Sequence, residues 1–197
     1  MILGLTGKYC SGKSTVGSLL KQDGWHVLDV DGLGHQVLEE KSRDIIEIFG
    51  ESVVEGGRIS RKLLGRIVFS DPAKRLMLEG VLHPRMVELC RNFIREKESH
   101  GKGAVVNAAL LHYMRLDEMC DHVIFVSCPA IYRYFRGKNR DGVNLRNFLQ
   151  RNRAQKHIHV YNIACKGAVF CLYNNRNPEY LKHQLHRLLQ LLERKDI

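Results

Sequence analysis

The chain of 197 residues is long enough to bury one core, with room for smaller appended parts. Hydrophobic residues at 44% and charged residues at 26% are ordinary for a soluble globular protein. No apolar run reaches the length of a membrane span, and the N-terminus lacks the basic start and long apolar segment of a secretory signal. We therefore expect a cytoplasmic protein that does not associate with a membrane.

Charge and cysteine content narrow the possible partners only in part. Lysine and arginine number 31 against 21 aspartate and glutamate residues, which gives a formal net charge of +10. Such a surplus suits a polyanionic small substrate or nucleic acid, and equally a merely basic surface. The six cysteines include no Cys-x-x-Cys pair, so reduced thiols are a simpler account than a zinc site.

The first expected elements surround a glycine-rich loop. An apolar run at residues 2–5 predicts a buried strand, and apolar residues at helical spacing predict a helix from residue 13 onward. Between them, residues 7–14 read Gly-Lys-Tyr-Cys-Ser-Gly-Lys-Ser, the pattern of a phosphate-binding loop. In such a loop the backbone amides and the helix N-terminus bind phosphate, Lys13 reaches the outer phosphates, and Ser14 coordinates Mg²⁺. The loop predicts a nucleotide-binding enzyme or switch.

Two aspartates end the next apolar run. Residues 25–31 predict a second strand on which Asp29 and Asp31, two apart, would share a face. In an open parallel sheet, ligands lie beyond the carboxyl ends of the strands. A carboxylate there can hold a metal or accept a proton from an attacking hydroxyl. The alternative is an aspartate that caps the following helix, expected to begin at residues 32–34.

Residues 34–100 are expected to be helical, without strand signals. Their amphipathic stretches end at Gly50 and at residues 56–57, and Asp71 followed by Pro72 predicts a helix start. His83 and Pro84 should interrupt that helix, because proline removes a backbone donor. By analogy, P-loop kinases of small molecules bind their acceptor in a helical insertion at this place in the chain.

Three further apolar runs, at residues 103–107, 121–126 and 168–172, predict the remaining strands of a parallel sheet buried on two faces. A final helix should follow Asn177 and Pro178, with its leucines on the buried side. The expected fold is therefore α/β, a five-stranded parallel sheet wound by helices, with a helical insertion and a helical lid. We assign residues 1–33, 101–129 and 157–197 to a nucleotide-binding core, 34–100 to the insertion, and 130–156 to the lid.

Arginines cluster in the expected lid. Three of them lie three and four residues apart and would share one face of a helix: Arg133, Arg136 and Arg140. Asn144 is expected to cap a second helix that turns Leu145, Phe148 and Leu149 inward. Arginine binds phosphate with two parallel hydrogen bonds and keeps its charge, so two such helices suit a lid over phosphates.

In this order the pieces resemble the dephospho-CoA kinases, the family that finishes coenzyme A synthesis. The likeness covers nearly the whole chain. Its most distinctive feature is the Leu-His-Pro triplet at residues 82–84, far downstream of the phosphate loop, which separates this family from adenylate and cytidylate kinases. The other matching positions are Gly4–Gly7 leading into Ser11–Thr15, Asp29 and Asp31, Arg61, Arg136, Arg140, Arg151 with Gln155, and Leu172 with Asn174 and Asn175.

The resemblance implies transfer of phosphate from ATP, with Mg²⁺, to the ribose 3′-hydroxyl of dephospho-CoA. It implies Asp31 as the base, with Lys13 and Arg140 as the other catalytic residues. The acceptor pocket would include Asp31, His83, Pro84 and Leu110, and the metal would lie at Ser14 and Asp29. The residues implied for ATP are Lys8, Tyr9, Cys10, Ser11, Gly12, Lys13, Ser14, Thr15, Arg136 and Asn175.

The sequence departs from the family pattern after the third strand and inside the loop. Ala109 stands where the family usually has proline, and His112 and Tyr113 follow where a carboxylate is usual. Lys8, Tyr9 and Cys10 add bulk where small residues are commoner, and residues 157–166 are longer and more polar than expected.

Two rival functions remain open from the sequence. The first is another P-loop kinase, acting on a nucleoside or nucleotide. The second is a non-enzymatic switch or a nucleic-acid-binding ATPase, although the guanine-reading Asn-Lys-x-Asp motif is absent. We expect dephospho-CoA as the partner rather than nucleic acid.

Overall fold

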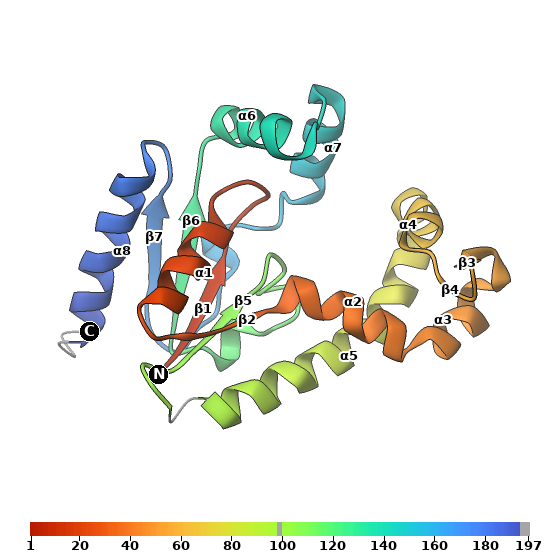
Figure 1. The fold of residues 1–197 in the computed structure, drawn as a ribbon, viewed down its shortest axis with the longest axis horizontal. Coiled ribbons are helices and arrows are strands. Elements are labelled where there is room, and N and C mark those ends of the chain that lie inside the picture. Colours follow the sequence, from red (N-terminus) through yellow and green to blue (C-terminus); the bar gives the residue numbers. More distant parts are fainter. Residues whose placement is uncertain (98–99, 194–197) are drawn as a thin grey trace. The chain divides into compact units, whose positions relative to one another are not determined.

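The computed structural model describes residues 1–97 and 100–193. The chain divides into two compact units, one formed by Met1–Asp29 with Phe93–Ile197 and the other by Val30–Asn92. Figure 1 shows the sheet and its helices in the first unit and only short strands among the helices of the second.

The first unit is built on a five-stranded parallel sheet, as the sequence predicts. Its strands are ordered β2-β5-β1-β6-β7, and every pair of neighbours is parallel. Their bounds are β1 Ile2–Thr6, β2 His26–Asp29, β5 Ala104–Asn107, β6 His122–Ser127 and β7 Val169–Tyr173. β1 and β5 are buried at every residue, which fits their continuous apolar sequence.

Helices α1 (Lys13–Gln22) and α8 (Pro178–Glu193) supply the main core against this sheet. Leu3 and Leu5 of β1 lie in one apolar cluster with Val16 and Leu20 of α1. Five buried leucines of α8 complete the same cluster, as expected from their spacing: Leu181, Leu185, Leu188, Leu189 and Leu192. The predicted start of α8 is also confirmed, because Asn177 Oδ1 accepts the backbone N–H of Tyr180 at 2.9 Å.

The prediction of a second strand through residue 31 is wrong at its end. β2 stops at Asp29, and α2 (Val30–Glu40) begins at the next residue. Asp31 therefore lies in the first turn of a helix and does not share a strand face with Asp29. Val30 is buried, and an acidic side chain in a first helical turn interacts favourably with the helix dipole, so the local sequence supports an early start.

The second unit contains a short hairpin that the sequence analysis missed. α3 (Ser42–Phe49) and a 3₁₀ turn (Glu51–Val53) lead into β3 (Val54–Glu55) and β4 (Arg58–Ile59), which pair antiparallel. The two residues between the strands, Gly56 and Gly57, have φ of 59° and 77°. Two consecutive positive φ angles are what the two-residue turn of a hairpin needs, and only glycine adopts them without strain.

Helices α4 (Arg61–Ser70) and α5 (Pro72–Lys97) complete this unit. The predicted start of α5 is confirmed, since Asp71 Oδ1 accepts the N–H groups of Ala73 and Lys74 at 2.9 and 3.2 Å. The predicted interruption at His83 and Pro84 is wrong, because α5 continues through them. Buried side chains further along α5, Met86, Cys90 and Ile94, anchor the helix beyond the exposed proline.

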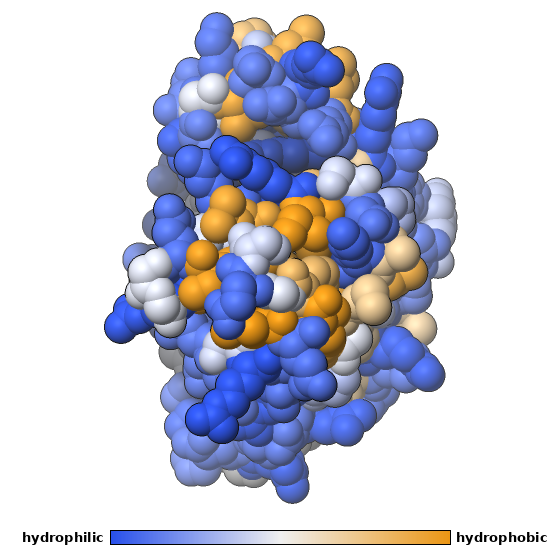
Figure 2. All heavy atoms as spheres, turned by 90° about the vertical axis from the view of Figure 1, so that its right-hand side faces the viewer, coloured by the Kyte–Doolittle hydropathy of each residue, from blue (hydrophilic) through white to orange (hydrophobic). Residues whose placement is uncertain are grey.

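Apolar side chains of the second unit are also exposed. Its own core contains Leu38, Ile45, Val53, Leu64 and Val68. Figure 2 shows apolar atoms gathered near the centre of the face it presents, within hydrophilic surroundings. The large exposed apolar residues of this unit are Ile48, Phe69, Leu76 and Met77.

The two helices predicted for the lid are present as α6 (Ala130–Asp141) and α7 (Leu145–Ala154). Gly142, with φ of 64°, ends α6, and Asn144 Oδ1 caps α7 by accepting the N–H of Asn147 at 2.9 Å. Phe148 is buried as predicted, but Leu145 and Leu149 are exposed, so that part of the prediction is wrong. Phe148 packs against α6, edge-on to Tyr134 at 5.5 Å.

Among residues 1–97 and 100–193, no helix combines the length and apolar character needed to cross a membrane.

Candidate functional site

The glycine-rich loop joins β1 to α1, and its backbone requires glycine at both ends of the motif. Gly12 has φ of 105°, and a Cβ atom there would lie 2.0 Å from Asn174 Nδ2. At Gly7 a Cβ atom would lie 2.6 Å from the carbonyl oxygen of Val126. The chain also turns on itself between these glycines, where Ser11 N–H donates to Lys8 O at 3.0 Å. The loop is thus compact, with main-chain groups close to the start of α1.

Lys13 and Ser14 are the first two residues of α1. No acidic side chain occupies the first turn of this helix, so the positive end of its dipole stays available to an anion. Lys13 Nζ donates to Asn107 Oδ1 at 3.0 Å. Ser14 and Thr15 are exposed beside it. This arrangement suits phosphate groups lying over the loop.

Asn107 is a site residue that the sequence analysis did not identify. It ends β5, next to β2, and pairs in register with Asp29. Its amide is buried and directs Lys13. The only signal in the sequence was a polar residue at the end of an apolar strand, which is the edge where ligands bind in parallel sheets.

Oxygen ligands for a hard cation are present near the loop. Ser14 and Asp29 are both exposed, and Asp29 is aligned with the asparagine that holds Lys13. A hydroxyl and a carboxylate are the ligand types that Mg²⁺ prefers, usually together with waters and substrate phosphates. Within the described residues no group of three or more His, Cys, Asp or Glu side chains could hold a metal. A hydroxyl and a carboxylate at this place suit a cation that takes its other ligands from water and substrate.

Arg136 and Asn174 join the lid and the last strand to the loop. Arg136 donates from NH2 to Asn174 Oδ1 at 3.0 Å and to Asn174 O at 3.2 Å. Asn174 Nδ2 in turn donates to Ser11 O at 2.8 Å. The structure thus brings the predicted Arg136 to the loop. Asn174 is buried in this contact, whereas Asn175, predicted as the nucleotide-binding residue, is exposed.

Arg133 supports the loop from the same helix, a role the sequence did not reveal. It is only 4% exposed and donates to the backbone oxygen of Cys128 at 3.0 Å and to Asn152 Oδ1 at 2.7 Å. No carboxylate pairs with it in the part of the chain that the structure describes. Burial lowers the pKa of Arg133, and burial together with the charge of Arg133 lowers the pKa of Lys8. This uncompensated positive charge favours an anionic ligand nearby.

Arg140 lies at the C-terminal end of α6, where Tyr9 of the loop meets it. The Arg140 guanidinium lies 5.4 Å from the Tyr9 ring centre and donates to Asp141 at 2.9 Å from both Nε and NH2. The hydrogen bonds to Asp141 raise the pKa of Arg140. Cys10, the next loop residue, has φ of 58° and is half-buried.

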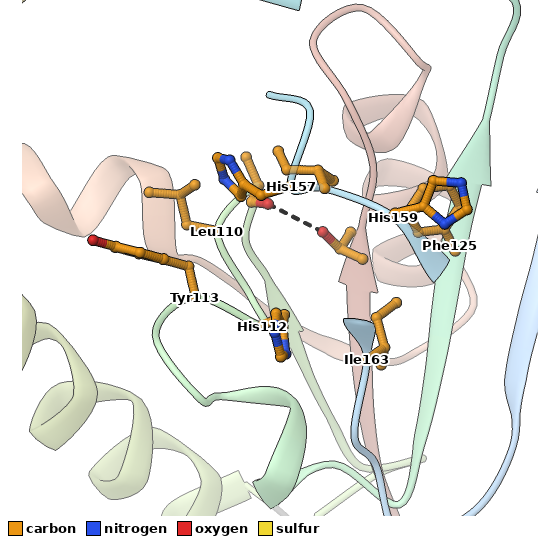
Figure 3. Close-up of a pocket in the computed structure, with 10 residues that line it drawn as sticks. Leu110, His112, Tyr113, Phe125, His157, His159 and Ile163 are labelled. Carbon is orange, nitrogen blue, oxygen red and sulfur yellow. Dashed lines mark hydrogen bonds between the residues drawn. The ribbon is translucent and has the colours of Figure 1, made fainter. Parts of the chain in front are cut away.

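Leu110 lies in the loop that follows β5, facing the segment after the lid. Figure 3 shows His157 beside Leu110 and Tyr113 at a small pocket, and His159 on its far side beside Phe125. Thr6 Oγ1 donates to Ala109 O at 3.3 Å, which ties the loop to the end of β1. The structure thus gives residues 157–166 a place beside the predicted acceptor-side residue Leu110.

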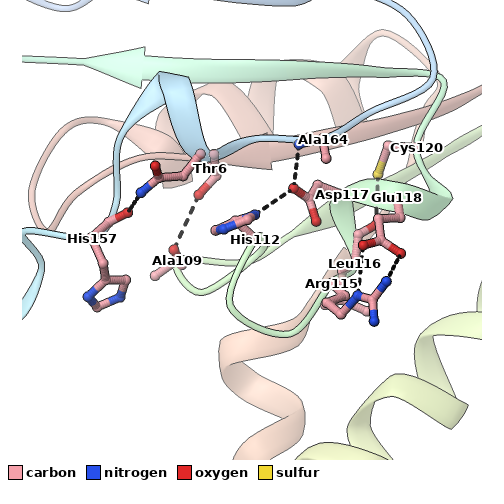
Figure 4. Close-up of polar contacts among 11 residues, drawn as sticks. Thr6, Ala109, His112, Arg115, Leu116, Asp117, Glu118, Cys120, His157 and Ala164 are labelled. Carbon is pink, nitrogen blue, oxygen red and sulfur yellow. Dashed lines mark hydrogen bonds and ion pairs between the residues drawn. The ribbon is translucent and has the colours of Figure 1, made fainter.

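Asp117 connects the loop that follows β5 to the segment after the lid. Figure 4 shows its Oδ2 atom between His112 Nδ1, at 3.1 Å, and the backbone N–H of Ala164, at 2.8 Å. The aspartate is fully buried, whereas the His112 side chain that it holds is 48% exposed. His112, one of the departures from the family pattern, therefore helps to hold the segment after the lid.

The remaining predicted residues belong to the unit Val30–Asn92. Asp31 is exposed in the first turn of α2, and Pro84 is exposed within α5. His83 is half-buried, and burial lowers its pKa while the charge of Glu79 opposes the shift. Arg85 Nε donates to Glu40 at 2.8 Å and so links α5 to α2 within this unit.

A parallel sheet with a glycine-rich phosphate loop, a lysine at the start of the first helix and an arginine-bearing lid defines a P-loop kinase. Solved structures share this fold. One is shikimate kinase from Acinetobacter baumannii, with a TM-score of 0.53 and 17% identity over 100% of this chain and 94% of that one. Another is dephospho-CoA kinase from Campylobacter jejuni, with a TM-score of 0.71 and 21% identity over 100% and 98%.

Sequence comparison shows the family. The family model for dephospho-CoA kinase matches residues 1–175. The dephospho-CoA kinase of Thermus thermophilus is 36% identical over 96% of this chain and 90% of its own. That of Wolinella succinogenes is 30% identical over 98% and 94%. A crystal structure of TT1252 from T. thermophilus superposes with a TM-score of 0.82 at 33% identity, covering 98% and 97%. The chain belongs to the dephospho-CoA kinase family, a family of transferases.

Proposed function

We propose that this protein transfers the terminal phosphate of ATP to the ribose 3′-hydroxyl of dephospho-CoA, giving coenzyme A and ADP. The observation that carries the proposal is the phosphate loop, with Lys13 held by Asn107 and the lid bound to the loop through Arg136 and Asn174. Family membership over residues 1–175 selects the acceptor from among the substrates of P-loop kinases.

Binding of ATP is assigned to the loop and its neighbours. The backbone amides of residues 8–15 and the N-terminus of α1 would bind the phosphates, and Lys13 would neutralise the outer ones. Arg136 and Arg140 would add charge from the lid, where preorganised donors stabilise the transition state more than the ground state. Asn174, rather than Asn175, is the better candidate for the edge of the nucleotide site, because it already binds both Ser11 and Arg136.

Mg²⁺ is the expected metal, with Ser14 and Asp29 as its protein ligands. When bound, it would neutralise charge on the ATP phosphates. Asp29 would hold its carboxylate at the end of β2, while Asn107 keeps the Lys13 ammonium in place beside it.

Acceptor binding and activation are assigned to Asp31, His83, Pro84 and Leu110. Asp31 would orient the 3′-hydroxyl and take its proton as the oxygen attacks the phosphorus. Burial keeps His83 neutral at neutral pH, so it would contact the acceptor as a hydrogen-bonding group and not as a charge. The exposed apolar residues of the second unit would cover the uncharged pantetheine arm of the acceptor.

The test is a coupled assay of ADP release with ATP and Mg²⁺, run with dephospho-CoA, AMP, adenosine and no acceptor. We expect rapid release with dephospho-CoA and far slower release with the others. Equal rates with AMP and dephospho-CoA would identify the protein as a nucleotide kinase instead. Salt-sensitive binding of DNA or RNA, without transfer to any small acceptor, would support the nucleic-acid alternative.

A further inference from the structure

Tyr9, one of the bulky residues in the phosphate loop, directs its side chain to the lid. The Arg140 guanidinium lies 5.4 Å from the centre of its ring, and that of Arg151 lies 4.9 Å from it. Both distances are within the range of cation–π attraction. Arg140 belongs to α6 and Arg151 to α7, so a single ring contacts both helices of the lid.

The Tyr9 hydroxyl also makes a hydrogen bond to the lid. It donates to Asp141 Oδ2, the carboxylate that also accepts two hydrogen bonds from Arg140 at 2.9 Å. Burial and the hydrogen bond to Asp141 raise the pKa of Tyr9 to about 12, and the bonds from Arg140 and Tyr9 lower the pKa of Asp141 to about 2. A neutral donor therefore faces a charged acceptor throughout the pH range in which enzymes work.

The backbone of Tyr9 is also bound by the lid segment. Its N–H donates to Gln155 Oε1 at 2.8 Å, and its carbonyl oxygen lies 3.5 Å from Arg133 NH1. The ring fits against α6 at a glycine, because a Cβ atom at Gly137 would lie 3.0 Å from Tyr9 Cε1. The lid thus has a place shaped for this ring.

We propose that Tyr9 is a positioning residue whose ring and hydroxyl hold α6 and α7 against the phosphate loop, so that Arg140 and Arg151 meet the substrate phosphates already ordered. The proposal rests on the kinase function proposed above, in which the lid arginines act on the transferred phosphate. A long arginine side chain loses much conformational freedom when it is fixed. Fixing it before substrate binds lowers the cost of reaching the transition state.

Two substitutions separate the ring from the hydroxyl. Tyr9→Phe keeps the aromatic face and removes only the bond to Asp141, whereas Tyr9→Leu fills similar space without an aromatic face. We expect Tyr9→Leu to lower kcat about tenfold or more, within the roughly 10²-fold that a displacement of about 1 Å can cost. Tyr9→Phe should retain more of the activity. The KM for ATP should change less than about twofold in both variants, since ground-state contacts stay in place.

A double-mutant cycle tests whether Tyr9 acts through the arginine. If it does, Tyr9→Leu combined with Arg151→Ala should lose clearly less than the product of the two single losses. Arg146 is the matched control, because it is an exposed arginine of the same helix without a contact to the Tyr9 ring. For the control pair, the loss in kcat of the double variant should equal the product of the losses caused by Arg146→Ala and Tyr9→Leu alone.

Hydrogen exchange gives a readout that does not depend on activity. In the nucleotide-free protein, amides of residues 130–155 should exchange faster in Tyr9→Leu than in the wild type, with Tyr9→Phe between them. A wild-type protein inactive on dephospho-CoA would reject the proposed function, while the exchange data would still report on Tyr9. With an active wild type, unchanged kcat and exchange in Tyr9→Leu would overturn the inference, and so would a rise in kcat. A fall in ATP affinity that matches the fall in kcat would also overturn it, by making Tyr9 a binding residue.

Discussion

At the residue scale, Gly12 leaves no room for a side chain, and Gly17 of the helix that follows provides its control. Gly12→Ala places a methyl group 2.0 Å from Asn174 Nδ2 at φ of 105°. We expect a loss of about 1–3 kcal/mol in the free energy of unfolding and weakened nucleotide binding. Gly17→Ala meets only ordinary contacts, the nearest at 3.6 Å from Leu5, and should be neutral or up to about 1 kcal/mol stabilising.

Urea unfolding and nucleotide titration of both variants check this pair. Equal stability of Gly12→Ala and the wild type would mean that the contact between Asn174 and Ser11 is dispensable.

Asp29, the last residue of β2, and Asp31, in the first turn of α2, should differ in what their substitution affects. Asp31→Asn keeps the shape and removes the basicity, so we expect normal folding, nearly normal binding of Mg-ATP, and transfer at least roughly a hundredfold slower. Asp29→Asn should instead weaken metal-dependent binding, because Asp29 is aligned with the residue that holds Lys13. The measurements are kcat, ATP affinity and Tm for both variants. If Asp31→Asn kept more than about a third of the activity, Asp29 would become the candidate base.

The residues that form the site could be predicted only where they belong to a motif or to a regular spacing in the sequence. The loop, Lys13 and the arginine face of α6 follow from spacing. The support that Arg133 gives to the loop could not be assigned, because its contact with Asn152 depends on how α7 packs against α6. Asn174 and Asn175 could not be distinguished for a related reason, because the difference between these adjacent asparagines is the tertiary contact of Asn174 with Ser11.

At the element scale, α5 contains two prolines with different consequences. Pro72 begins the helix, where no backbone bond is lost, whereas Pro84 lies inside it. Pro84→Ala should restore an N–H donor to the helix and raise the free energy of unfolding by about 1–3 kcal/mol. Its activity with dephospho-CoA should fall, since Pro84 is assigned to the acceptor pocket. Pro72→Ala should change both quantities little.

Chemical unfolding and steady-state kinetics on these two variants decide the matter. A Pro84→Ala protein that is both more stable and fully active would remove Pro84 from the acceptor pocket.

Local sequence signals predicted most elements and failed where two of them conflicted. The caps Asp71, Asn144 and Asn177 were read correctly, because a side chain that accepts backbone N–H groups is a strong local determinant. Proline at residue 84 was read as a break, but the buried residues that follow it favour continuing the helix. The hairpin at residues 54–59 was missed because its strands have only two residues each, too few for a periodic pattern.

At the scale of the whole molecule, the sheet was predictable because each strand is a continuous apolar run between helical segments. The order β2-β5-β1-β6-β7 does not follow from the sequence, since any one strand could pair with several others. The surplus of positive charge is likewise a property of the whole chain, and it bears on stability as well as on substrate.

The pH dependence of stability should combine this general charge with one half-buried histidine, His83. The chain carries +10 with its 10 histidines neutral, so acidification below neutral pH adds like charge and lowers stability. His83 adds a specific part, because burial lowers its folded pKa below the ordinary value of 6.5. The unfolded chain then binds more protons, so this stabilisation is present above about pH 6.5 and is lost as pH falls through the folded value.

Added salt and substitution of His83 should separate the two contributions to the pH dependence of stability, general charge repulsion and the His83 side chain. Raising NaCl from about 0.01 to 0.15 M shortens the screening length from roughly 30 to 8 Å, which should reduce the general part of the pH slope. The His83 part arises mainly from burial and should persist in salt. His83→Gln should therefore flatten the remaining decline in Tm between about pH 6.5 and 5, and His183→Gln is the control for removing an exposed histidine. Parallel slopes for His83→Gln and the wild type in 0.15 M NaCl would show that His83 binds its proton equally in the folded and unfolded chain, which would contradict its burial.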